Sequence, residues 1–345
     1  MFRLDRKLSN IRQGRYRPED FIIADAKDSD MSTGIPGTGF DRTGGVPRRR
    51  SRQEFVSEIE RIIKQDVVDI MLVSASNLEL LDERSAFSGT GVKPAIRTNS
   101  STDTWGTIRN STYASVPSRP FRSTNLARTK GGAASCRPDG SAGGTDLGLY
   151  SITFNNDVAS DAASMEQFDI FVRDASAHGF KYFLEVFNPN VDIGLAPEEI
   201  GDFVNDSILR LLAGTVRIDR PQFLKMTYNG PRALEDLASF DSELVVGVLG
   251  GGAGTTRDTL ELLSQAERYG ARIALFGRKI NLAEDSLALI SIMREIAERR
   301  VGSLEGVRAY HDQLEKKGLT PIRSLDEDCS ITQEILRSGQ VQRAR

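Results

Sequence analysis

The chain has 345 residues, of which 39% are hydrophobic, so it is long enough to bury a large core in one large domain or two ordinary ones. Its formal net charge of −3 gives no support for general affinity toward nucleic acids or membrane surfaces. No apolar run approaches the roughly 18–20 residues that span a bilayer, the N-terminus lacks the apolar core of a signal peptide, and only two cysteines are present, so a reducing cytoplasm is expected.

Eight short apolar runs rich in Val, Ile, Leu and Phe are predicted to be strands. In chain order they are 21–25, 70–74, 95–98, 147–154, 182–187, 223–226, 244–249 and 273–276. Amphipathic stretches that are predicted to be helices lie between or after most of them, at 51–65, 165–177, 197–213, 232–239, 256–269 and 282–299. Asn281 is the expected N-cap of the last helix, with Glu284 three positions further on.

This alternation predicts parallel strands joined by crossover helices, a fold of the α/β class. Eight units favour a closed (β/α)8 barrel, the TIM barrel, over a doubly wound open sheet, whose strands would show the same near-continuous apolar character. We expect one domain over 1–345, with a barrel core at about 18–302 and a charged C-terminal helical extension at 303–345.

Two predicted loops, 26–50 and 99–145, are unusually long, and both follow strand ends, which places them on the face of the barrel where active sites lie. The second is rich in Ser, Thr and Gly and holds six basic residues against two acidic ones. It is either a solvated insertion or a cationic lid that closes over an anionic substrate. The six basic residues are Arg109, Arg119, Arg122, Arg128, Lys130 and Arg137.

Lys225 ends the apolar run 223–226 and is the most informative residue of the chain. Partial burial of a lysine disfavours its charged form and leaves free amine, which condenses with carbonyl groups to form Schiff bases. The alternative is an ordinary lysine at a strand end that pairs with a carboxylate. We take Schiff-base formation as the working hypothesis.

Two carboxylates and one further cation lie in or at the ends of predicted strands. Glu185 lies inside an apolar strand, and because charged groups are seldom buried without a partner, Lys225 on the next strand is its natural neighbour. Its role would be proton transfer, unless the pair is only structural. Asp25 ends the first strand and could relay protons, bind a substrate hydroxyl or cap the following loop. Arg97 on the third strand could balance these charges.

Glycines at the ends of the last two strands indicate a site for phosphate. Gly251 and Gly252 follow the seventh strand, and Gly277 and Arg278 follow the eighth. Glycines let backbone N–H groups approach an anion, and in barrels the loops after strands seven and eight often hold phosphate. The alternative is a tight strand–helix turn. A dinucleotide fingerprint fails, because the third glycine position is occupied by Arg257.

The chain has only two histidines, His178 and His311, in polar stretches that look helical. A zinc-dependent aldolase needs several histidines converging on one metal ion, which these cannot supply. The lysine route to carbonyl chemistry is therefore favoured, and we expect neither a metal nor another cofactor.

Taken together, these motifs resemble the class I (Schiff-base) aldolase superfamily that includes tagatose-bisphosphate, archaeal-type fructose-bisphosphate and deoxyribose-phosphate aldolases. The resemblance runs from about residue 21 to 298. It rests on the order and strand placement of the segments 23–25, 183–185, 221–225, 251–252 and 277–278.

The resemblance implies that Lys225 is the nucleophile, that Glu185 is the acid/base, and that Gly251, Gly252, Gly277 and Arg278 hold phosphate. It also implies a phosphorylated sugar as substrate and a homo-oligomer as the assembly. A lysine-dependent transferase of the thiolase or transaldolase kind, or a non-catalytic sugar-phosphate binder, stays open as an alternative.

The chain departs from the superfamily where a substrate would lie. The archaeal-type branch has a catalytic tyrosine on strand five, near the position of Phe187 here, which leaves acid/base chemistry to Glu185. Residues 26–30 do not match the sequence that is customary in the superfamily. The basic residue that is usual on strand three is represented only by Arg97. The 99–145 insertion has no counterpart. The exact substrate is therefore left open.

Overall fold

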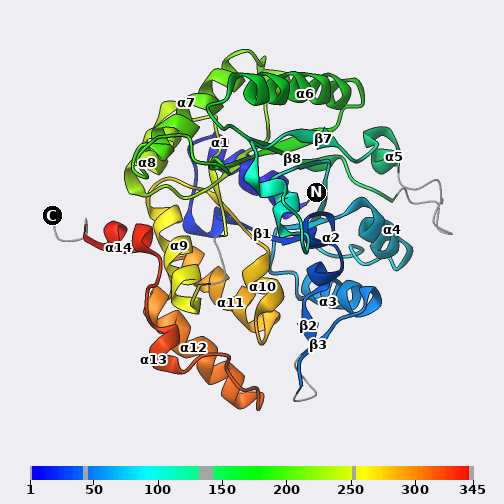
Figure 1. The fold of residues 1–345 in the computed structure, drawn as a ribbon. Helices are drawn as coiled ribbons and strands as arrows, with labels where there is room; N and C mark the ends of the chain where they lie inside the picture. Colours follow the sequence, from blue (N-terminus) through cyan, green and yellow to red (C-terminus); the bar gives the residue numbers. More distant parts are fainter. Residues whose placement is uncertain (1, 42–45, 132–142, 251–253, 342–345) are drawn as a thin grey trace.

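The computed structural model of the chain describes residues 2–41, 46–131, 143–250 and 254–341 (Figure 1). Eight parallel strands close into a barrel in the order β1-β12-β11-β10-β9-β8-β5-β4, which confirms the predicted TIM barrel and excludes the open sheet. All eight strands lie within a few residues of the predicted positions. They are β1 (Ile22–Lys27), β4 (Ile70–Val73), β5 (Lys93–Arg97), β8 (Leu147–Thr153), β9 (Lys181–Phe187), β10 (Leu224–Met226), β11 (Gly247–Leu249) and β12 (Ile273–Phe276).

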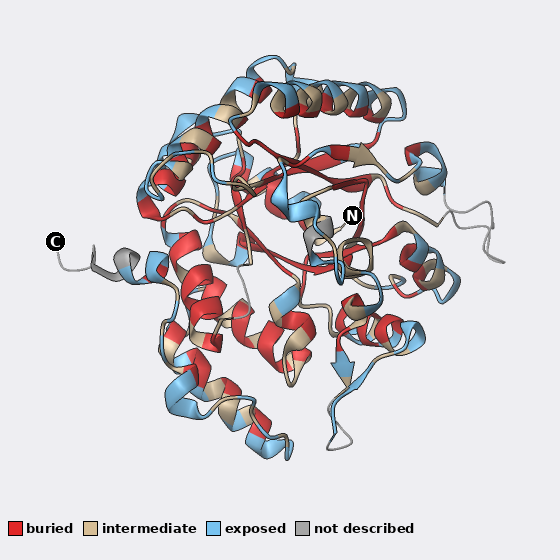
Figure 2. Ribbon diagram, in the orientation of Figure 1, coloured by how far each residue is buried: buried red, intermediate tan, exposed pale blue. Residues whose placement is uncertain are grey.

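Helices form a layer around the outside of the barrel, with their buried sides turned to the strands and their exposed sides to solvent (Figure 2). They bury apolar stripes at helical spacing, because this is how an amphipathic helix covers a sheet. The helices are α3 (Arg52–Gln65), α4 (Ala75–Glu83), α6 (Val158–Ala177), α7 (Ile200–Ala213), α8 (Pro231–Phe240), α9 (Thr256–Arg268) and α11 (Ser286–Ala297).

Alternate residues of each strand face the inside and the outside of the barrel. The inner core contains Ile22 and Ala24 of β1 together with Phe183 and Phe223, whose rings stack with centroids 4.5 Å apart. Ile23 belongs to the outer core, between the strands and the helices. This alternation decides which polar side chains reach the interior of the barrel.

The helix α1 (Arg3–Arg12) closes the N-terminal end of the barrel. No helix was predicted for these residues from the sequence. Leu4, Leu8 and Ile11 join the inner core. The Lys7 Nζ donates hydrogen bonds to the carbonyl of Phe21 and, at 3.0 Å, to Asp69. The barrel is therefore open only at the C-terminal ends of its strands.

The predicted helix 282–299 corresponds to the single helix α11, which begins only at Ser286, and the separate short helix α10 (Arg278–Leu282) precedes it. The N-cap of α11 is Asp285, whose side chain accepts the N–H of Ala288. Asn281 lies inside α10, and its amide donates to the carbonyl of Gly37 in the loop after β1. The prediction of Asn281 as N-cap was wrong, because its side chain holds a long-range contact that local sequence does not reveal.

The described parts of the two long loops contain short helices and strands. The 26–50 loop contains α2 (Ser29–Thr33), η2 (Ile35–Thr38), β2 (Phe40–Asp41) and β3 (Arg48–Arg49). In the 99–145 insertion, β6 (Asn99–Ser101) and β7 (Pro120–Arg122) form an antiparallel pair. Its other elements are the short 3-10 turns η3 (Thr104–Thr107) and η4 (Tyr113–Ser115) and the helix α5 (Leu126–Gly131). Two further turns are η1 (Pro18–Asp20) and η5 (Arg217–Asp219).

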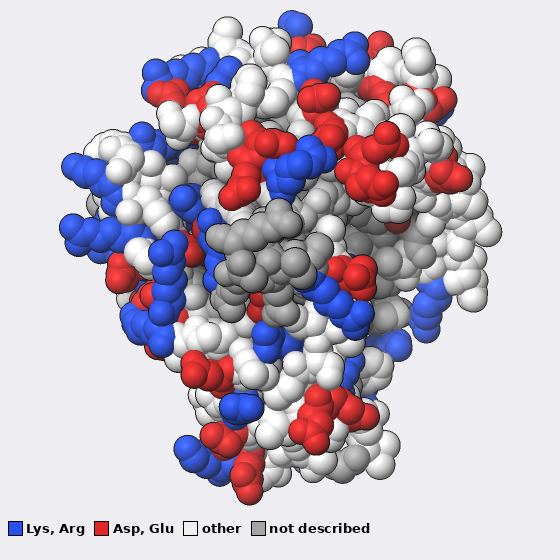
Figure 3. Space-filling model, turned by 90° about the vertical axis from the view of Figure 1, so that its left-hand side faces the viewer, with Lys and Arg blue, Asp and Glu red and all other residues white. Residues whose placement is uncertain are grey.

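Three helices follow the barrel, namely α12 (Ser303–Lys316), α13 (Leu325–Asp328) and α14 (Glu334–Val341). α12 packs against α9 and α11, α13 against α12, and α14 against α9 (Figure 1). Lys/Arg and Asp/Glu side chains are interspersed on the molecular face that carries α8 and α9 (Figure 3). None of the helices in the described part of the chain is both long and apolar enough to cross a bilayer.

Candidate active site

A cleft of about 450 Å³ lies at the C-terminal ends of the barrel strands. It brings together five of the residues predicted from the sequence, namely Lys225, Glu185, Arg97, Gly277 and Arg278. They come from the ends of β10, β9, β5 and β12 and the residues that follow β12, so the barrel closure unites segments that are far apart in the sequence. In TIM barrels, this end of the strands is where active sites are found.

Lys225 and Glu185 form a buried ion pair at the floor of the cleft. They are partners in register on the neighbouring parallel strands β10 and β9, and both side chains point inward, two residues after the stacked Phe223 and Phe183. Lys225 Nζ contacts Glu185 Oε1 directly. The amine and the carboxylate are thus held together, and a proton can pass between them.

The second oxygen of Glu185 is held by two donors. Oε2 accepts from Arg97 Nη2 at 3.1 Å and from Ser151 Oγ at 2.5 Å. Burial alone would raise the pKa of Glu185, but the charges of Lys225 and Arg97 outweigh burial, and the pKa is lowered. The carboxylate is therefore kept ionised and ready to accept a proton.

Arg97 is the centre of this network. Burial would lower its pKa, but the carboxylates of Asp28 and Glu185 raise it, so the guanidinium stays charged. Its Nε donates to Asp28, and its Nη1 donates to Ser151 Oγ at 2.8 Å. Ser151 is fixed in turn, because its N–H donates to Asn99 Oδ1 at 2.7 Å.

Sequence reasoning missed Asp28 and Ser151 as members of this site. Asp28 directly follows β1 and lines the cleft. Ser151 is a polar residue inside the buried strand β8. An acidic residue just beyond a strand end and a hydroxyl within an apolar strand are signals that could have found both.

The structure corrects the placement expected for Asp25, which does not line the cleft with the other candidate catalytic residues. In register it lies beside Phe276 and Met71, both of the outer core, so its side chain points outward between the strands and the helices. There it lies 3.5 Å from Lys27 Nζ, and both side chains are fully buried. Burial raises the pKa of Asp25 to about 7, against the opposing effect of Lys27.

The loop after β12 contributes Gly277 and Arg278 to the rim of the cleft. A Cβ on Gly277 would lie 2.7 Å from the carbonyl oxygen of Ala26, so only glycine allows this close approach of the loop to β1. Arg278 is exposed and has no hydrogen bond or ion pair with any other residue that the structure describes. Its guanidinium is free to bind an anion.

The other half of the predicted phosphate site is only partly visible. Gly251 and Gly252 lie outside the described residues, while Gly250 lines the cleft. The N-terminus of α9, which follows these glycines, would also favour an anion. In the structure the N–H of Thr256 in the first turn of α9 donates to Asp328 Oδ1 at 2.7 Å, so a carboxylate from the C-terminal helices already occupies that position.

The insertion lines part of the cleft, and its described residues argue against the cationic lid, one of the two interpretations drawn from the sequence. None of its basic residues in the described part of the chain lines the cleft. Arg122 pairs with Asp174 on α6, and Lys130 donates to the carbonyl of His178. The wall is formed instead by Asp103, Thr104 and other short polar residues.

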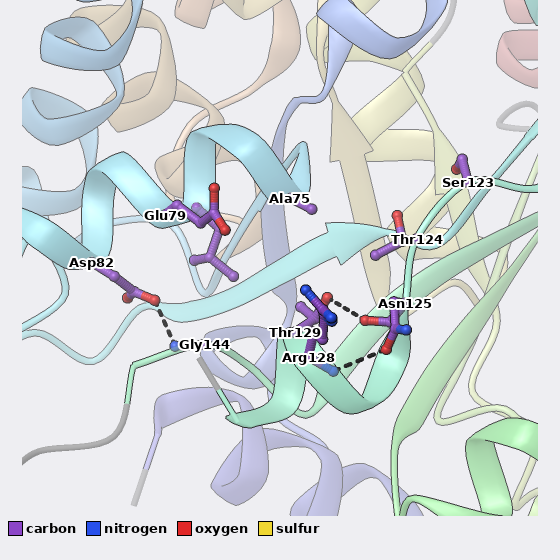
Figure 4. Close-up of a pocket in the computed structure, with 10 residues that line it drawn as sticks. Ala75, Glu79, Asp82, Ser123, Thr124, Asn125, Arg128, Thr129 and Gly144 are labelled. Atoms are coloured by element: carbon purple, nitrogen blue, oxygen red, sulfur yellow. Dashed lines mark hydrogen bonds between the residues drawn. The ribbon is translucent and has the colours of Figure 1, made fainter. Parts of the chain in front are cut away.

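A second cavity of about 520 Å³ lies between α4 and the segment that leads into α5 (Figure 4). Glu79, Asp82 and Arg128 line it, and Asp82 accepts the N–H of Gly144 at its edge. It contains none of the residues predicted for the active site. This cavity is larger than the cleft at the strand ends, but its described lining contains no lysine in contact with a carboxylate. We therefore place the candidate active site in the cleft and not in this cavity.

The fold is similar to those of fructose-1,6-bisphosphate aldolases of known structure. A Schiff-base-forming fructose-1,6-bisphosphate aldolase gives a TM-score of 0.59 at 16% identity, over 86% of this chain and 100% of that chain. An archaeal fructose 1,6-bisphosphate aldolase gives 0.58 at 15% identity, over 86% and 99%. An archaeal fructose-1,6-bisphosphate aldolase with its catalytic lysine covalently bound to the carbinolamine intermediate gives 0.57 at 17% identity, again over 86% and 99%.

No protein-family model matches the sequence, and a search of curated proteins found no significant match. At identities this low, structural likeness establishes the fold and not the activity. The resemblance drawn from the sequence motifs is thus confirmed at the level of the barrel fold, and the chemistry has to be argued from the site.

Proposed function

We propose that this protein is a class I aldolase, a lyase that cleaves a phosphorylated ketose through a Schiff base on Lys225. The observation that carries the proposal is the contact between the Lys225 amine and the Glu185 carboxylate at the floor of the cleft. An amine beside a base is the arrangement that lysine nucleophiles require. The solved aldolase of similar fold whose catalytic lysine is bound as a carbinolamine supports the same chemistry here.

The reaction would begin when the Lys225 amine, having passed its proton to Glu185, adds to the ketone carbon of the substrate. Glu185 returns this proton to the carbinolamine hydroxyl, which leaves as water. The product is an iminium ion, which acts as the electron sink, and the carboxylate is ionised again. Ionised Glu185 then takes the proton of the C4 hydroxyl, the C3–C4 bond breaks, and its electron pair moves into the iminium to give an enamine. The aldehyde fragment leaves. Protonation at C3 and hydrolysis then release dihydroxyacetone phosphate and free Lys225.

The remaining residues of the cleft would bind and position the substrate. Arg278 provides a guanidinium that can hold a phosphate by two parallel hydrogen bonds. Arg97 does not touch the reacting atoms in this scheme. It positions Glu185 and, together with Lys225, keeps its carboxylate ionised.

Borohydride trapping tests the proposal. Incubation with dihydroxyacetone phosphate and borohydride should reduce the iminium to a stable amine, which peptide mass spectrometry would locate on Lys225. Lys225→Met should abolish the adduct. Lys181→Met is the matched control, because Lys181 is an exposed lysine at the start of β9, outside the cleft, and its loss should leave trapping unchanged. Adduct formation on another lysine, or none at all, would refute the mechanism.

A further inference from the structure

The charges that line the cleft balance except at two places. Its described lining contains three cationic side chains, Arg97, Lys225 and Arg278, and three anionic ones, Asp28, Asp103 and Glu185. Arg97 is paired with Asp28 and Glu185, and Lys225 with Glu185. One cation, Arg278, and one anion, Asp103, are left over.

These two charges lie on opposite sides of the barrel. Arg278 follows β12, while Asp103 accepts a hydrogen bond of 2.6 Å from Thr153 Oγ1 at the end of β8. Around the closed ring, β12 and β8 are four steps apart in either direction. The cleft is therefore positive on one side and negative on the other.

The catalytic pair lies between these charges in an order that matches a sugar phosphate. Passing around the ring from β12 to β8, the residues are Arg278, then Lys225 on β10, then Glu185 on β9, then Asp103. A phosphate at Arg278 would place the ketone carbon over Lys225 and the C4 hydroxyl over Glu185. The aldehyde fragment that leaves would then point toward Asp103.

The wall around Asp103 is held by hydrogen bonds, and no cationic side chain among the residues that the structure describes lines the cleft beside it. The carboxylate also accepts the N–H of Thr104 and the hydroxyl of Ser118, at 2.8 and 2.9 Å. The hydroxyl of Thr107 donates to the carbonyl of Ser32 on α2, which joins the insertion to the loop after β1. The neighbouring lining residues are neutral hydrogen-bonding groups, namely Ser32, Thr33, Thr104, Thr107, Asn188 and Asn190.

From this polarity we infer that the enzyme acts on a ketose monophosphate, whose departing aldehyde is uncharged and rich in hydroxyl groups. The inference rests on the proposed aldolase function and specifies its substrate class. A second phosphate on the aldehyde fragment would lie against Asp103 without a cation to receive it, and the repulsion between these like charges would disfavour its binding. Hydroxyl groups, by contrast, would find donors and acceptors along the wall.

The experiment runs the reaction in the direction of synthesis. Dihydroxyacetone phosphate is combined with one of two matched acceptors, glyceraldehyde or glyceraldehyde 3-phosphate, and kcat/KM is measured for each. We expect a preference of about tenfold or more for the unphosphorylated acceptor. Asp103→Asn, which keeps the shape and removes the charge, should narrow that ratio.

Because Asp103→Asn could disturb the insertion, a second variant adds charge instead. Ser32→Lys places a cation on the part of α2 that contacts the insertion and should raise the use of the phosphorylated acceptor relative to the unphosphorylated one. A wild-type preference for the phosphorylated acceptor, or a ratio that neither variant changes, overturns the inference. If Lys225 is trapped by borohydride but neither acceptor reacts, the substrate class is wrong while the Schiff base stands. If Lys225 is not trapped, the proposed function itself fails.

Discussion

Lys225 and Glu185 are direct neighbours in register on two parallel strands. Each provides the opposite charge without which the other would be an uncompensated buried charge. Arg97 and Ser151 hold the second oxygen of Glu185. The position of the carboxylate therefore does not depend on Lys225 alone, and it can stay in place when the amine becomes bonded to a substrate. Removing either partner should have different consequences.

Replacing Glu185 by Gln should separate Schiff-base formation from bond cleavage. The amide keeps the size of the side chain but cannot take a proton from the C4 hydroxyl, so kcat for cleavage should fall by roughly 10²–10⁴. Borohydride trapping at Lys225 should still occur. Steady-state kinetics and mass spectrometry of the same preparation check both expectations, and cleavage at the wild-type rate would show that Glu185 is not the base.

Replacing Arg97 by Met should shift the pH dependence of cleavage. The pKa of Glu185 lies below its ordinary value of 4.5, because the charges of Lys225 and Arg97 outweigh its burial. Since the ionised form is the base, the acidic limb of kcat lies at correspondingly low pH in the wild type. Without the Arg97 charge the pKa rises, so the limb moves to higher pH.

Arg97→Lys is the control for this effect, because it retains a positive charge near Glu185 and should restore much of the wild-type profile. A loss of activity that is uniform across pH would instead mean that Arg97 only supports the structure. An unchanged acidic limb in Arg97→Met would contradict the role assigned to it.

The barrel could be predicted from the sequence because its strands are short apolar runs separated by amphipathic helices. The direction in which a single side chain points was harder to predict from the sequence. Ile22, Ile23 and Ala24 are all apolar, so β1 shows no alternation of period two from which the outward direction of Asp25 could have been read. A strand covered on both faces hides this information.

The site was predictable where it depends on neighbouring strands and on the residues directly after β12, and not where it depends on the long insertion. The expectation that Glu185 adjoins Lys225 followed from consecutive strands. The charge of the cleft wall could not be read from the insertion, because the count of basic residues does not say which of them face inward. Arg122, for example, is drawn outward by Asp174 on α6, a residue 52 positions away.

The outward pair of Asp25 and Lys27 should be dispensable for catalysis. Both side chains are fully buried. Among the residues that the structure describes, neither the two carboxylate oxygens of Asp25 nor Nζ of Lys27 has a hydrogen-bond partner. Replacing such a pair by apolar residues is often neutral or stabilising by about 1–4 kcal/mol. Asp25→Leu with Lys27→Met should therefore keep kcat and retain or raise Tm.

The single variant Asp25→Leu is the informative comparison. It leaves Lys27 as an unpaired buried amine, which should destabilise the fold by about 3–5 kcal/mol in chemical denaturation. A large loss of kcat in a folded double variant would return Asp25 to the catalytic machinery, contrary to its position in the structure.

Asp69, at the closed end of the barrel, should matter for stability and not for substrate binding. Its fully buried carboxylate forms ion pairs with Arg3 Nε and Arg294 Nη2, both at 2.7 Å, and with Lys7 Nζ at 3.0 Å. Burial would raise its pKa, but Arg294 and Lys7 lower it.

Asp69→Asn leaves three cations without their shared carboxylate and should cost about 3–5 kcal/mol of unfolding free energy. Asp66→Asn is the matched control, since Asp66 also contacts Arg3 but its side chain is 40% exposed, and its loss should cost at most about 1 kcal/mol. Because the N-terminal end of the barrel lies away from the cleft, KM should not change in either variant while the protein is folded. A raised KM in Asp69→Asn at a temperature well below its Tm would mean that the two ends of the barrel are coupled.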